Sequence, residues 1–572
     1  MLNKEEIRRT MRERRRALTP EKRAASSESI CAKLAALNLH SSVAVYLASP
    51  QEIDLSPLIL KMLARGVKVV APRWDGEAYE LAVLKGLDEA HLRQGPMGIL
   101  EPAEAEIVSP KEVEAWLVPG LAFTLNGKRV RYSGEGPDGR GALVSREFFN
   151  NMFQRITLDG DTVFSNEKGV KNPGYIVLSG KNGYAGCLDM QGHALKVTSP
   201  GPGRVGYFAL NSATVTNAGP MRIENTILAA YAPAKLGGKD DPPIIFGTNS
   251  QFTSYAMKRT ERPITVEAYA ESRMNLVLNT SAAVGDTNSY AFAGPWTFSP
   301  AAGRTGSVYF DQSGSTTNAT VTFSGPVTGP GGFQLKPTLM ADVRFTYPTN
   351  TFSGGITWSD LPGWTDTGYG AVVRFLYPGS LADYAQVTCD YGHSTVYMPN
   401  WPATNVLAFA NRATLKHGAT VAVDTSEAEG QTASLELSDA VIESEGFGLG
   451  HEGEGTLAVS GAWTKSPSLV AYGGKLEITG AGAKTLGVTR SQQDLRRSVI
   501  PELAIEDSGD VTISANGIQV GFGRVGAKQA GRQARMSVRN AKLVVPADTS
   551  SYPDAYFKIG YGCESGVLEI GD

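Results

Sequence analysis

The chain has 572 residues, of which 42% are hydrophobic and 19% charged, and this composition excludes an intrinsically disordered protein. Its net charge of −3, without a dominant basic patch, argues against nucleic acid as a partner. No run of about eighteen apolar residues occurs, so a membrane-spanning helix is not expected. The four cysteines lie far apart, without a Cys-x-x-Cys pair, and predict neither a disulfide framework nor a zinc site.

The composition changes abruptly near residue 130. The first 130 residues hold 36 charged side chains and 7 glycines, whereas the other 57 glycines fall in the remaining 442 residues. We therefore expect a first domain over residues 1–130, a junction over 131–156 and a repeat region over 157–572. No stretch rich in proline, glycine or serine marks the join.

The chain begins with a segment of helical periodicity. Over residues 4–16, Ile7 and Met11 fall on one face together with Leu18, and basic residues occupy the rest. The segment has no apolar core and no small-residue cleavage site, so it is not expected to be a signal peptide. A cytoplasmic location is the corresponding prediction.

Alternating helices and strands are predicted for the rest of the first domain. Thr19 and Pro20 predict the start of a helix whose apolar stripe is Ile30, Leu34 and Leu37. A further helix is expected to open at Ser56-Pro57, with Leu58, Ile59, Met62 and Leu63 facing inward, and to close at Gly66. Short apolar runs predict strands at residues 42–47, 67–72, 79–84 and 115–118. This alternation predicts a largely parallel, doubly wound α/β sheet.

Two segments follow strands at the edge where such sheets bind ligands, namely residues 48–54 and 119–129. The carboxylates of Glu52 and Asp54 could accept hydrogen bonds from the ring N–H and amino groups of a heterocycle. They could equally be ordinary loop acids, with Asp54 capping the helix that follows. Both interpretations stay open at this point.

Many short motifs of this part of the chain resemble the 5-formyltetrahydrofolate cyclo-ligase (5,10-methenyltetrahydrofolate synthetase) family in order and spacing. They are Lys4-x-x-x-Arg8, Arg15-Arg16-x-Leu18, Ser27-x-x-Ile30, Tyr46-Leu47, Glu52-Ile53-Asp54, Pro57-Leu58-Ile59, Gly66-x-x-Val69-x-x-Pro72-Arg73, Gly98-Ile99-Leu100-Glu101-Pro102, Val118-Pro119-Gly120-Leu121-Ala122-Phe123 and Gly127-x-Arg129.

The resemblance implies a specific reaction and its ligands. ATP would phosphorylate the formyl oxygen of 5-formyltetrahydrofolate, and the neighbouring folate nitrogen would close the ring to 5,10-methenyltetrahydrofolate with loss of phosphate. By the same resemblance, Lys4, Arg8 and Arg129 would bind the ATP phosphates, and Arg8, Leu47 and Glu52 would bind the substrate. ATP and Mg²⁺ are the implied cofactors, although no metal ligand of the family is found here.

The resemblance weakens after Arg129. Family members continue with a glycine loop and a Tyr-Tyr-Asp-Arg element, whereas residues 127–140 here lack that element and carry Glu135 where phosphate would lie. The family's last strands and a later metal-binding acid have no counterpart. We therefore expect a truncated sheet, with cyclo-ligase turnover impaired or lost.

The remainder of the chain predicts an all-β fold. Short alternating strands separated by Gly, Asn, Asp, Ser and Thr begin near residue 157, and no amphipathic stretch of helix length interrupts them. A unit at residues 435–461 is repeated at 536–571. Because such a unit cannot bury its apolar face alone, stacking into a right-handed parallel β-solenoid is expected.

These units resemble the repeats of autotransporter-type bacterial surface proteins, which implies a role in cell-surface adhesion or carbohydrate contact. Other motifs in this part carry less weight. Two Gly-x-Gly-x-x-Gly matches, at residues 201–206 and 521–526, open no predicted helix and are expected by chance. His393, His417 and His451 stand alone, without metal-ligand spacing. Glu443, Glu445, Glu452 and Glu454 predict an acidic patch, usually a solvated edge and only occasionally a calcium site.

Three functional hypotheses follow from the sequence. The first is an ATP-dependent cyclo-ligase acting on 5-formyltetrahydrofolate, the second a surface or adhesin-like solenoid, and the third a non-functional gene fusion. The absence of a signal peptide counts against the second hypothesis. The cyclo-ligase motifs are the most specific, so the first hypothesis gives the preferred function.

Overall fold

A computed structural model describes most of the chain. The residues described are 17–35, 41–49, 52–117, 129–136, 139, 141–145, 151–167, 174–180, 185–200, 206–231, 233–255, 259–279, 288–313, 319–335, 341–358, 372–390, 393–416, 418–426, 428–492, 499–513, 517–521, 533–544, 557–559 and 565–571. The chain divides into two compact units, Met1–Gly127 (unit 1) and Lys128–Asp572 (unit 2). Among the described residues, no helix is both long and apolar enough to cross a membrane.

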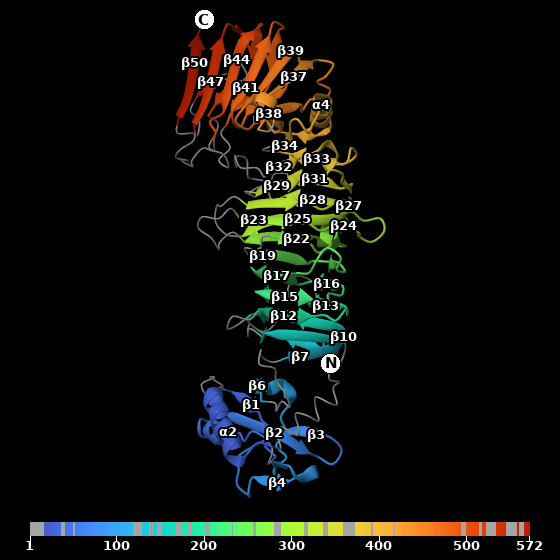
Figure 1. Cartoon of the computed structure of the whole chain (residues 1–572), viewed down its shortest axis with the longest axis vertical. Coiled ribbons are helices and arrows are strands. Elements are labelled where there is room, and N and C mark those ends of the chain that lie inside the picture. Colours follow the sequence, from blue (N-terminus) through green and yellow to red (C-terminus); the bar gives the residue numbers. More distant parts are fainter. Residues whose placement is uncertain are drawn as a thin grey trace. The chain divides into compact units, whose positions relative to one another are not determined.

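Unit 1 contains a four-stranded sheet in the order β3-β2-β1-β6 (Figure 1). Its strands are β1 (Ser42–Ala44), β2 (Lys68–Trp74), β3 (Tyr79–Val83) and β6 (Ala115–Trp116). β1 pairs in parallel with β2 and β6, and β3 runs antiparallel to β2. The predicted α/β class is therefore confirmed, and each of the four predicted strands is found.

Two helices flank this sheet in the sequence order that the motifs predict. α2 (Pro20–Ala35) begins after Thr19, whose Oγ1 accepts a hydrogen bond from the backbone N–H of Lys22 at 3.3 Å. α3 (Ser56–Ala64) ends before Gly66, which adopts the left-handed conformation with φ 74°. Leu58, Ile59 and Met62 of α3 are buried, as predicted.

The predicted apolar stripe of α2 is partly wrong. Ile30 is 37% exposed, and the residues that α2 buries are Ser27 and Cys31, with Leu34 packed beside them against the core. The helix has turned a mixed face inward because the Ser27 hydroxyl and the Cys31 thiol both bond to the loop after β1. Leu37 lies outside the described residues.

Small elements complete unit 1. They are the hairpin strands β4 (Leu92–Gln94) and β5 (Leu100–Pro102) and the short 3-10 turns η1 (Pro96–Gly98) and η2 (Pro110–Glu112). The carboxylate of Glu101, which is 3% exposed, accepts hydrogen bonds from the Trp74 backbone N–H at 2.9 Å and from Arg93 Nε at 2.8 Å. The hairpin is thereby attached to the carboxyl end of β2.

Unit 2 is a series of stacked coils (Figure 1). Each strand pairs in parallel with strands of the neighbouring coils, and the paired strands form long parallel sheets. The first sheet contains β7 (Arg129–Gly134), β8 (Leu143–Ser145), β10 (Arg155–Asn166), β12 (Gly186–Asp189), β13 (Leu195–Thr198), β15 (Ala213–Thr216), β16 (Met221–Glu224), β18 (Ile244–Phe246), β21 (Ile264–Val266), β24 (Trp296–Phe298), β27 (Val327–Gly329) and β30 (Thr351–Phe352). The second sheet contains β9 (Asn151–Phe153), β11 (Tyr175–Ser179), β14 (Tyr207–Asn211), β17 (Ile227–Tyr231), β19 (Gln251–Tyr255), β22 (Met274–Asn279), β25 (Gly306–Ser313), β28 (Gly331–Leu335), β31 (Gly355–Trp358), β33 (Val387–Cys389) and β35 (Thr414–Leu415).

Three further sheets complete the stack. The third contains β20 (Arg259–Thr260), β23 (Asn288–Phe292), β26 (Ala319–Phe323), β29 (Ala341–Phe345), β32 (Val372–Phe375), β34 (His393–Tyr397), β36 (Thr420–Asp424), β38 (Gly448–Glu452), β40 (Ser468–Ala471), β43 (Thr489–Ser491), β46 (Ile518–Val520) and β49 (Phe557–Ile559). The fourth contains β37 (Thr432–Ser438), β39 (Thr456–Ala462), β41 (Lys475–Gly480), β44 (Glu502–Ser508), β47 (Gln533–Arg539) and β50 (Ser565–Gly571). The fifth contains β42 (Lys484–Leu486), β45 (Val511–Ile513) and β48 (Leu543–Val544). This architecture confirms the predicted parallel β-solenoid.

The core of the solenoid is built from the inward residue of every second position. Phe292, Phe323, Phe345 and Phe375 occupy one register column of the third sheet, and neighbouring rings stack at 5.2, 5.0 and 5.7 Å between centroids. Because strand neighbours are about 4.8 Å apart, identical side chains in one column can stack in this way. The alternation seen in the sequence therefore becomes a continuous apolar column.

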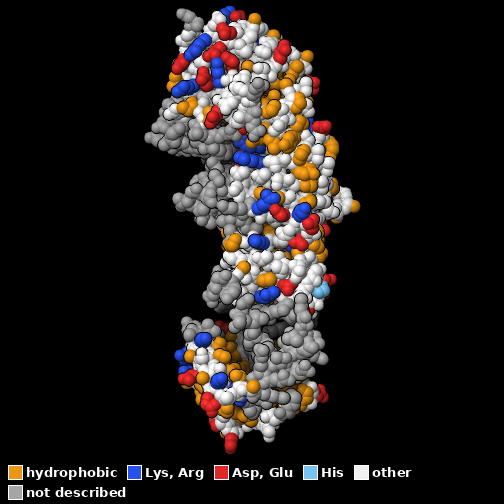
Figure 2. Space-filling model, in the orientation of Figure 1, with side chains coloured by type: hydrophobic (Ala, Val, Ile, Leu, Met, Phe, Trp, Pro, Cys, Tyr) orange, Lys and Arg blue, Asp and Glu red, His pale blue; other side chains and the backbone are white. Residues whose placement is uncertain are grey.

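Polar side chains also stack from coil to coil at the corners. Asn225 and Asn249 both adopt positive φ angles, 53° and 49°, and the amide of Asn249 donates to the Asn225 side-chain oxygen at 3.3 Å. Asparagine tolerates this conformation better than most residues do. On the outer surface, ion pairs join successive coils, including Lys475 of β41 with Glu506 of β44 at 2.6 Å. Figure 2 shows acidic and basic side chains next to one another at the end of the solenoid that Figure 1 draws in red.

The expectation that no helix interrupts the strands is wrong, because the described part of unit 2 contains the helix α4 (Ala403–Arg412). α4 buries Val406, Phe409 and Ala410, and the Phe409 ring contacts Phe375 edge-on at 5.6 Å. The spacing i, i+3, i+4 of these three buried residues is a helical signal that the expectation of an all-β region overlooked. The described residues of unit 2 also include the short 3-10 turns η4 (Ala270–Ser272), η5 (Pro378–Ser380) and η6 (Glu429–Gln431). The expected junction, residues 131–156, contributes strands β7, β8 and β9 and the start of β10.

The predicted acidic patch is wrong for one of its four members. Glu443, Glu445 and Glu454 are exposed, but Glu452 is fully buried and ion-paired with Arg374. Other motifs fall partly outside the described residues. These are His417, the side chain of His393, residues 201–205 of the first glycine motif and residues 522–526 of the second. His451 is buried, and its Nε2 lies 2.9 Å from the Thr425 hydroxyl.

Candidate functional site

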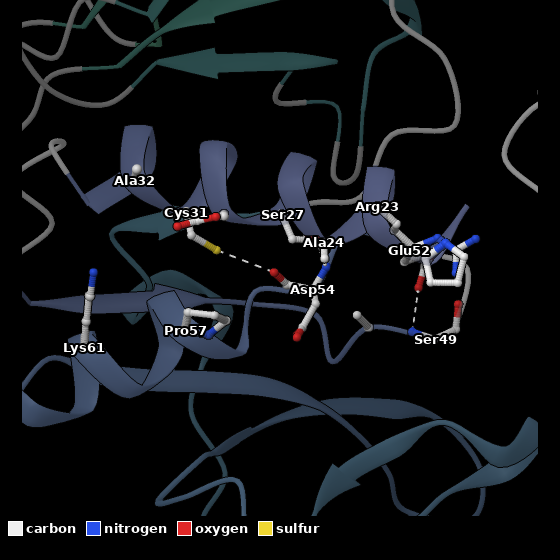
Figure 3. A pocket seen from close by; sticks show the side chains of 13 residues that line it. Arg23, Ala24, Ser27, Cys31, Ala32, Ser49, Glu52, Asp54, Pro57 and Lys61 are labelled. Atoms are coloured by element: carbon white, nitrogen blue, oxygen red, sulfur yellow. Dashed lines mark hydrogen bonds between the residues drawn. The ribbon is translucent and has the colours of Figure 1, made fainter. Parts of the chain in front are cut away.

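A cleft in unit 1 is the strongest candidate for a binding site. It has a volume of 870 Å³ and lies between α2, the loop after β1 and the start of α3 (Figure 3). Its lining residues are Pro20, Arg23, Ala24, Ser27, Glu28, Cys31, Ala32, Ala48, Ser49, Glu52, Asp54, Pro57 and Lys61. The cleft follows the carboxyl end of β1, the edge where sheets of this class bind ligands.

Glu52 is held in place by its own loop. Its Oε2 accepts a hydrogen bond from the Ser49 backbone N–H at 3.0 Å, and its own N–H donates to the Ser49 carbonyl oxygen at 2.9 Å (Figure 3). These reciprocal bonds hold Ser49 and Glu52 against each other. The carboxylate is thus positioned at the cleft by the backbone, with little freedom left to the side chain.

Asp54 has a structural role in the same loop. Its Oδ1 accepts hydrogen bonds from the backbone N–H of Ser56 at 2.9 Å and from the Ser56 hydroxyl at 2.6 Å. The N-cap of α3 is Leu55, which has no side-chain cap hydrogen bond, so the expected capping by Asp54 is wrong. The bonds to Ser56 form a short turn just before the helix, as an ordinary loop acid does. Of the two acids considered, Asp54 therefore serves the loop and Glu52 is the candidate for ligand contact.

The loop is tied to α2 by two buried polar groups. The Asp54 backbone N–H donates to Ser27 Oγ at 2.9 Å, and the Cys31 thiol donates to the Asp54 carbonyl oxygen at 3.5 Å. Within the loop itself, the hydroxyl of Tyr46, which follows β1, donates to the Ile53 carbonyl oxygen at 2.9 Å. These bonds fix the position of the loop between the helix and the sheet, and with it the shape of the cleft.

The Cys31 thiol is a donor here and is not activated as a nucleophile. Burial raises its pKa, and the nearby Asp54 carboxylate raises it further. A thiol with a raised pKa stays protonated at neutral pH, as its bond to the Asp54 carbonyl oxygen requires. Covalent catalysis through Cys31 is therefore not favoured by its surroundings.

The cleft also contains charged residues that sequence reasoning did not single out. Arg23 and Glu28 come from α2, and Lys61 comes from α3. The α2 residues that line the cleft include positions 24, 28 and 32, which recur every four residues and so share one face of the helix. This spacing is the signal in the sequence that α2 presents one face to the cleft. That face could not be recognised as a cleft wall before the position of the loop was known.

The other predicted site residues are distributed over both units. Leu47 is half-buried and packs against the core of unit 1. Arg129 is the first residue of β7 in unit 2, and its side chain lies outside the described residues, as do Lys4 and Arg8 entirely. The roles assigned to these four residues stay predictions.

The donors in the cleft do not fit a resident Mg²⁺ ion. Within the described part of the chain, no group of three or more His, Cys, Asp or Glu side chains could hold a metal. The Asp54 carboxylate is engaged with Ser56, and the Glu52 carboxylate with the backbone of Ser49. Octahedral Mg²⁺ sites usually rely on one or two carboxylates together with substrate phosphates, so no step is assigned to a metal held by these residues.

Comparison with known proteins confirms the resemblance found in the sequence. A family model described as the 5-formyltetrahydrofolate cyclo-ligase family matches residues 1–147. A solved NMR structure, that of 5,10-methenyltetrahydrofolate synthetase from Aquifex aeolicus, is 30% identical, with 22% of this chain and 65% of that chain covered and a TM-score of 0.20. The chain therefore spans less than two thirds of that protein. No curated protein matches the chain significantly.

Proposed function

We propose that unit 1 binds 5-formyltetrahydrofolate in the cleft beside Glu52, and ATP next to it, as a cyclo-ligase would. The observation that carries this proposal is the position of Glu52, whose carboxylate is fixed at the cleft within the residues that match the family. The cleft volume of 870 Å³ lies within the range of about 300–1,000 Å³ typical of small-molecule sites.

The Glu52 carboxylate suits the recognition of a pterin-like heterocycle. A carboxylate can accept about four hydrogen bonds, so the Glu52 carboxylate can hold several partners at once, and the N–H and amino groups of a ring would suit it. The apolar lining, which includes Ala24, Ala32 and Pro57, would contact the faces of the ring. The Arg23 and Lys61 side chains would offset the negative charge of a folate tail or of ATP phosphates.

The proposed chemistry is ATP-dependent cyclisation. The formyl oxygen attacks the γ-phosphorus of ATP and releases ADP, and the adjacent folate nitrogen then adds to the activated carbon. Loss of phosphate, with the nitrogen's proton passing to solvent, leaves 5,10-methenyltetrahydrofolate. Phosphoryl transfer depends mainly on positioning and on cationic groups, roles that the family resemblance gives to Lys4, Arg8 and Arg129.

We further propose that turnover is impaired or lost in this chain. Arg129, the expected first residue of a nucleotide loop, begins β7, whose backbone runs in register with β10, Arg129 opposite Arg155. Successive N–H groups of an extended strand point to opposite edges, so this stretch cannot direct a run of neighbouring N–H groups at one phosphate. This conformation supports the loss of efficient catalysis.

Two measurements on the full-length chain test these proposals separately. Calorimetric titration with 5-formyltetrahydrofolate should show binding that Glu52→Ala weakens about tenfold or more, because a polar group of the ligand would lose its partner. Glu77→Ala, an exposed acid in the β2–β3 turn that makes the same charge change, should bind as the unaltered chain does. Absence of binding to the unaltered chain would overturn the first proposal.

The second measurement follows the absorbance of 5,10-methenyltetrahydrofolate formed with ATP. Little or no product is expected, even where titration shows that the folate binds. Rapid turnover that Glu52→Ala abolishes would support the cyclo-ligase and refute its impairment. The two outcomes are therefore distinguishable on the same protein samples.

For unit 2 we propose a structural role with a contact surface, the alternative function inferred from its repeats. What supports it is an outward aromatic set on the second sheet, in which Tyr175 stacks on Tyr207 at 4.8 Å and Tyr231 on Tyr255 at 4.1 Å. Rings of this kind provide rigid contact area with a polar tip. Binding to an array of bacterial polysaccharides, lost in Tyr231→Ala, would support this role, and no binding to any of them would count against it.

A further inference from the structure

The family match extends beyond unit 1 into the first residues of unit 2. The cyclo-ligase family model extends to residue 147, but the compact units divide between residues 127 and 128. The last twenty residues of the family match therefore lie in unit 2. The structure of this stretch indicates what it does there.

β7 and β8 pair along one edge of β10, the first long strand of the solenoid. Residues 129–132 of β7 lie opposite residues 155–158 of β10, and residues 143–145 of β8 lie opposite residues 164–166. The other edge of β10 pairs with β12 and β13, which belong to the next coil. Among the described residues, β7 and β8 thus form the terminal rung of the first sheet.

The side chains of this rung cover the end of the apolar core. Tyr132 stands in register with Leu158, and its ring contacts Phe164 edge-on at 5.4 Å between centroids. Leu143 stands opposite Phe164 and packs against the same core. Burial raises the pKa of Tyr132 to about 12. Leu158 and Phe164 are fully buried as a result, although they lie in the first long strand of the stack.

The turn between β7 and β8 depends on glycine. Gly136 and Gly141 have φ angles of 72° and 128°, and a Cβ on Gly136 would lie 2.1 Å from the Gly141 carbonyl oxygen. The Gly141 N–H donates to the Glu135 carbonyl oxygen at 2.6 Å, and the Ala142 N–H donates to the Val163 carbonyl oxygen at 2.8 Å. Glycines that would expose N–H groups in a phosphate loop here shape a tight connection between strands.

We propose that residues 129–145 act as the N-terminal cap of the solenoid. End coils of repeat proteins have no neighbour on one side, so their core must be covered by atypical residues. Tyr132 and Leu143 supply that cover, and the glycine turn lets both strands lie along β10. This role goes beyond the proposed folate site and does not require unit 1 to bind any ligand.

Hydrogen exchange measured by mass spectrometry on the full-length chain tests the cap. Tyr132→Ala should speed exchange across residues 155–166 by about tenfold or more, while exchange in β2 and in β47 stays unchanged. Tyr132→Phe keeps the ring and should exchange like the unaltered chain. Tyr79→Ala, which removes a tyrosine that is 51% exposed in unit 1, is the matched control and should leave residues 155–166 unaffected.

Two results would overturn the proposal. The first is unchanged exchange over residues 155–166 in Tyr132→Ala. The second is protection of residues 129–145 by added ATP together with faster exchange in β10, since that would make the stretch a nucleotide loop. If Tyr132→Ala does not fold, Leu143→Ala makes a smaller cavity in the same rung, and its outcomes are read in the same way. Failure of folate binding would leave all these results unchanged.

Discussion

Arg374 sits in a buried ionic cluster on the third sheet, and its removal should destabilise the middle of the solenoid. Its side chain is 2% exposed. Its Nε lies 2.9 Å from an Asp342 oxygen, its Nη1 3.7 Å from an Asp424 oxygen, and its Nη2 donates to Glu452. Although burial opposes the charge, the Glu452 and Asp342 carboxylates raise the pKa of Arg374 well above its usual value.

The size of the stability loss in Arg374→Met can be worked out from the buried acids that lose their cation. Met is similar in length and fills the space, but three acidic groups, each less than 10% exposed, would lose a shared cation. Removing one partner from a buried ion pair typically costs about 3–5 kcal/mol. Partial protonation of the acids would relieve some of this cost, so we expect the variant, unlike the unaltered chain, to gain stability as the pH falls.

Hydrogen exchange in β29, β32, β36 and β38 reports the effect locally, which suits a chain that is not expected to unfold in two states. At 1.36 kcal/mol per factor of ten, the loss corresponds to about two to four orders of magnitude in protection. Arg344→Met is the matched control, because Arg344 is the register neighbour of Arg374 but is 42% exposed and should cost less than about 1 kcal/mol. Adding Glu452→Gln to Arg374→Met should restore part of the protection. Equal protection in Arg374→Met and in the unaltered chain would refute the reasoning.

Three further predictions concern the solenoid. Arg262→Met should cost about 2–4 kcal/mol, measured as lost protection around β18 and β21, because the fully buried guanidinium donates to three backbone carbonyls. The pKa of Glu506 is lowered, chiefly by the hydrogen bond from Lys475. This pair should therefore contribute stability at neutral pH that is lost as the pH falls below about 4.5. Glu506→Gln should flatten that part of the pH–stability curve. Burial lowers the pKa of Lys484, so the unaltered chain should gain stability relative to Lys484→Met as the pH rises from 8 to 10, measured by urea unfolding.

Each of these predictions has an outcome that contradicts it. Exchange in Arg262→Met no faster than in Arg304→Met, a variant at an arginine that is 47% exposed, would show that the buried bonds add little. An acid limb of the curve that Glu506→Gln leaves unchanged would assign the effect to other acids. A constant difference between Lys484→Met and the unaltered chain from pH 8 to 10 would mean that folding does not perturb the Lys484 amine.

Much of unit 1 could be predicted because its signals are local. Thr19-Pro20, Ser56-Pro57 and Gly66 mark helix ends through backbone preferences that act within a few residues. The inward face of α2 could not be predicted in the same way. Ser27 and Cys31 are buried because the distant Asp54 loop supplies their hydrogen-bond partners. Hydrophobicity alone points to Ile30 instead, which lies at the surface.

In unit 2 the period-two alternation predicts strands and their inward residues, but it does not predict pairing across coils. Glu452 reads as an exposed acid because its sequence neighbours Glu443, Glu445 and Glu454 are acidic and exposed. Its actual partner, Arg374, is 78 residues away and meets it only because β32, β34, β36 and β38 stack in sequence. Local composition therefore predicts the burial of Glu452 wrongly, because its partner comes from a distant coil.

No stretch rich in proline, glycine or serine marks the join in the sequence, and the strand pairing that begins at residue 129 gives a physical reason. A flexible linker is needed where the backbone of a connecting stretch finds no partners in either domain, because unsatisfied N–H and C=O groups must then stay in water. Here the stretch that begins at residue 129 enters a parallel ladder with β10 at once, so that one edge of β7 and one edge of β8 are hydrogen-bonded to the solenoid. The glycine-rich residues 134–141 permit this capture, since they provide the positive φ angles that the turn between the two strands requires. A glycine-rich composition that resembles an altered phosphate loop in the sequence is thus well suited to the first turn of a β-solenoid.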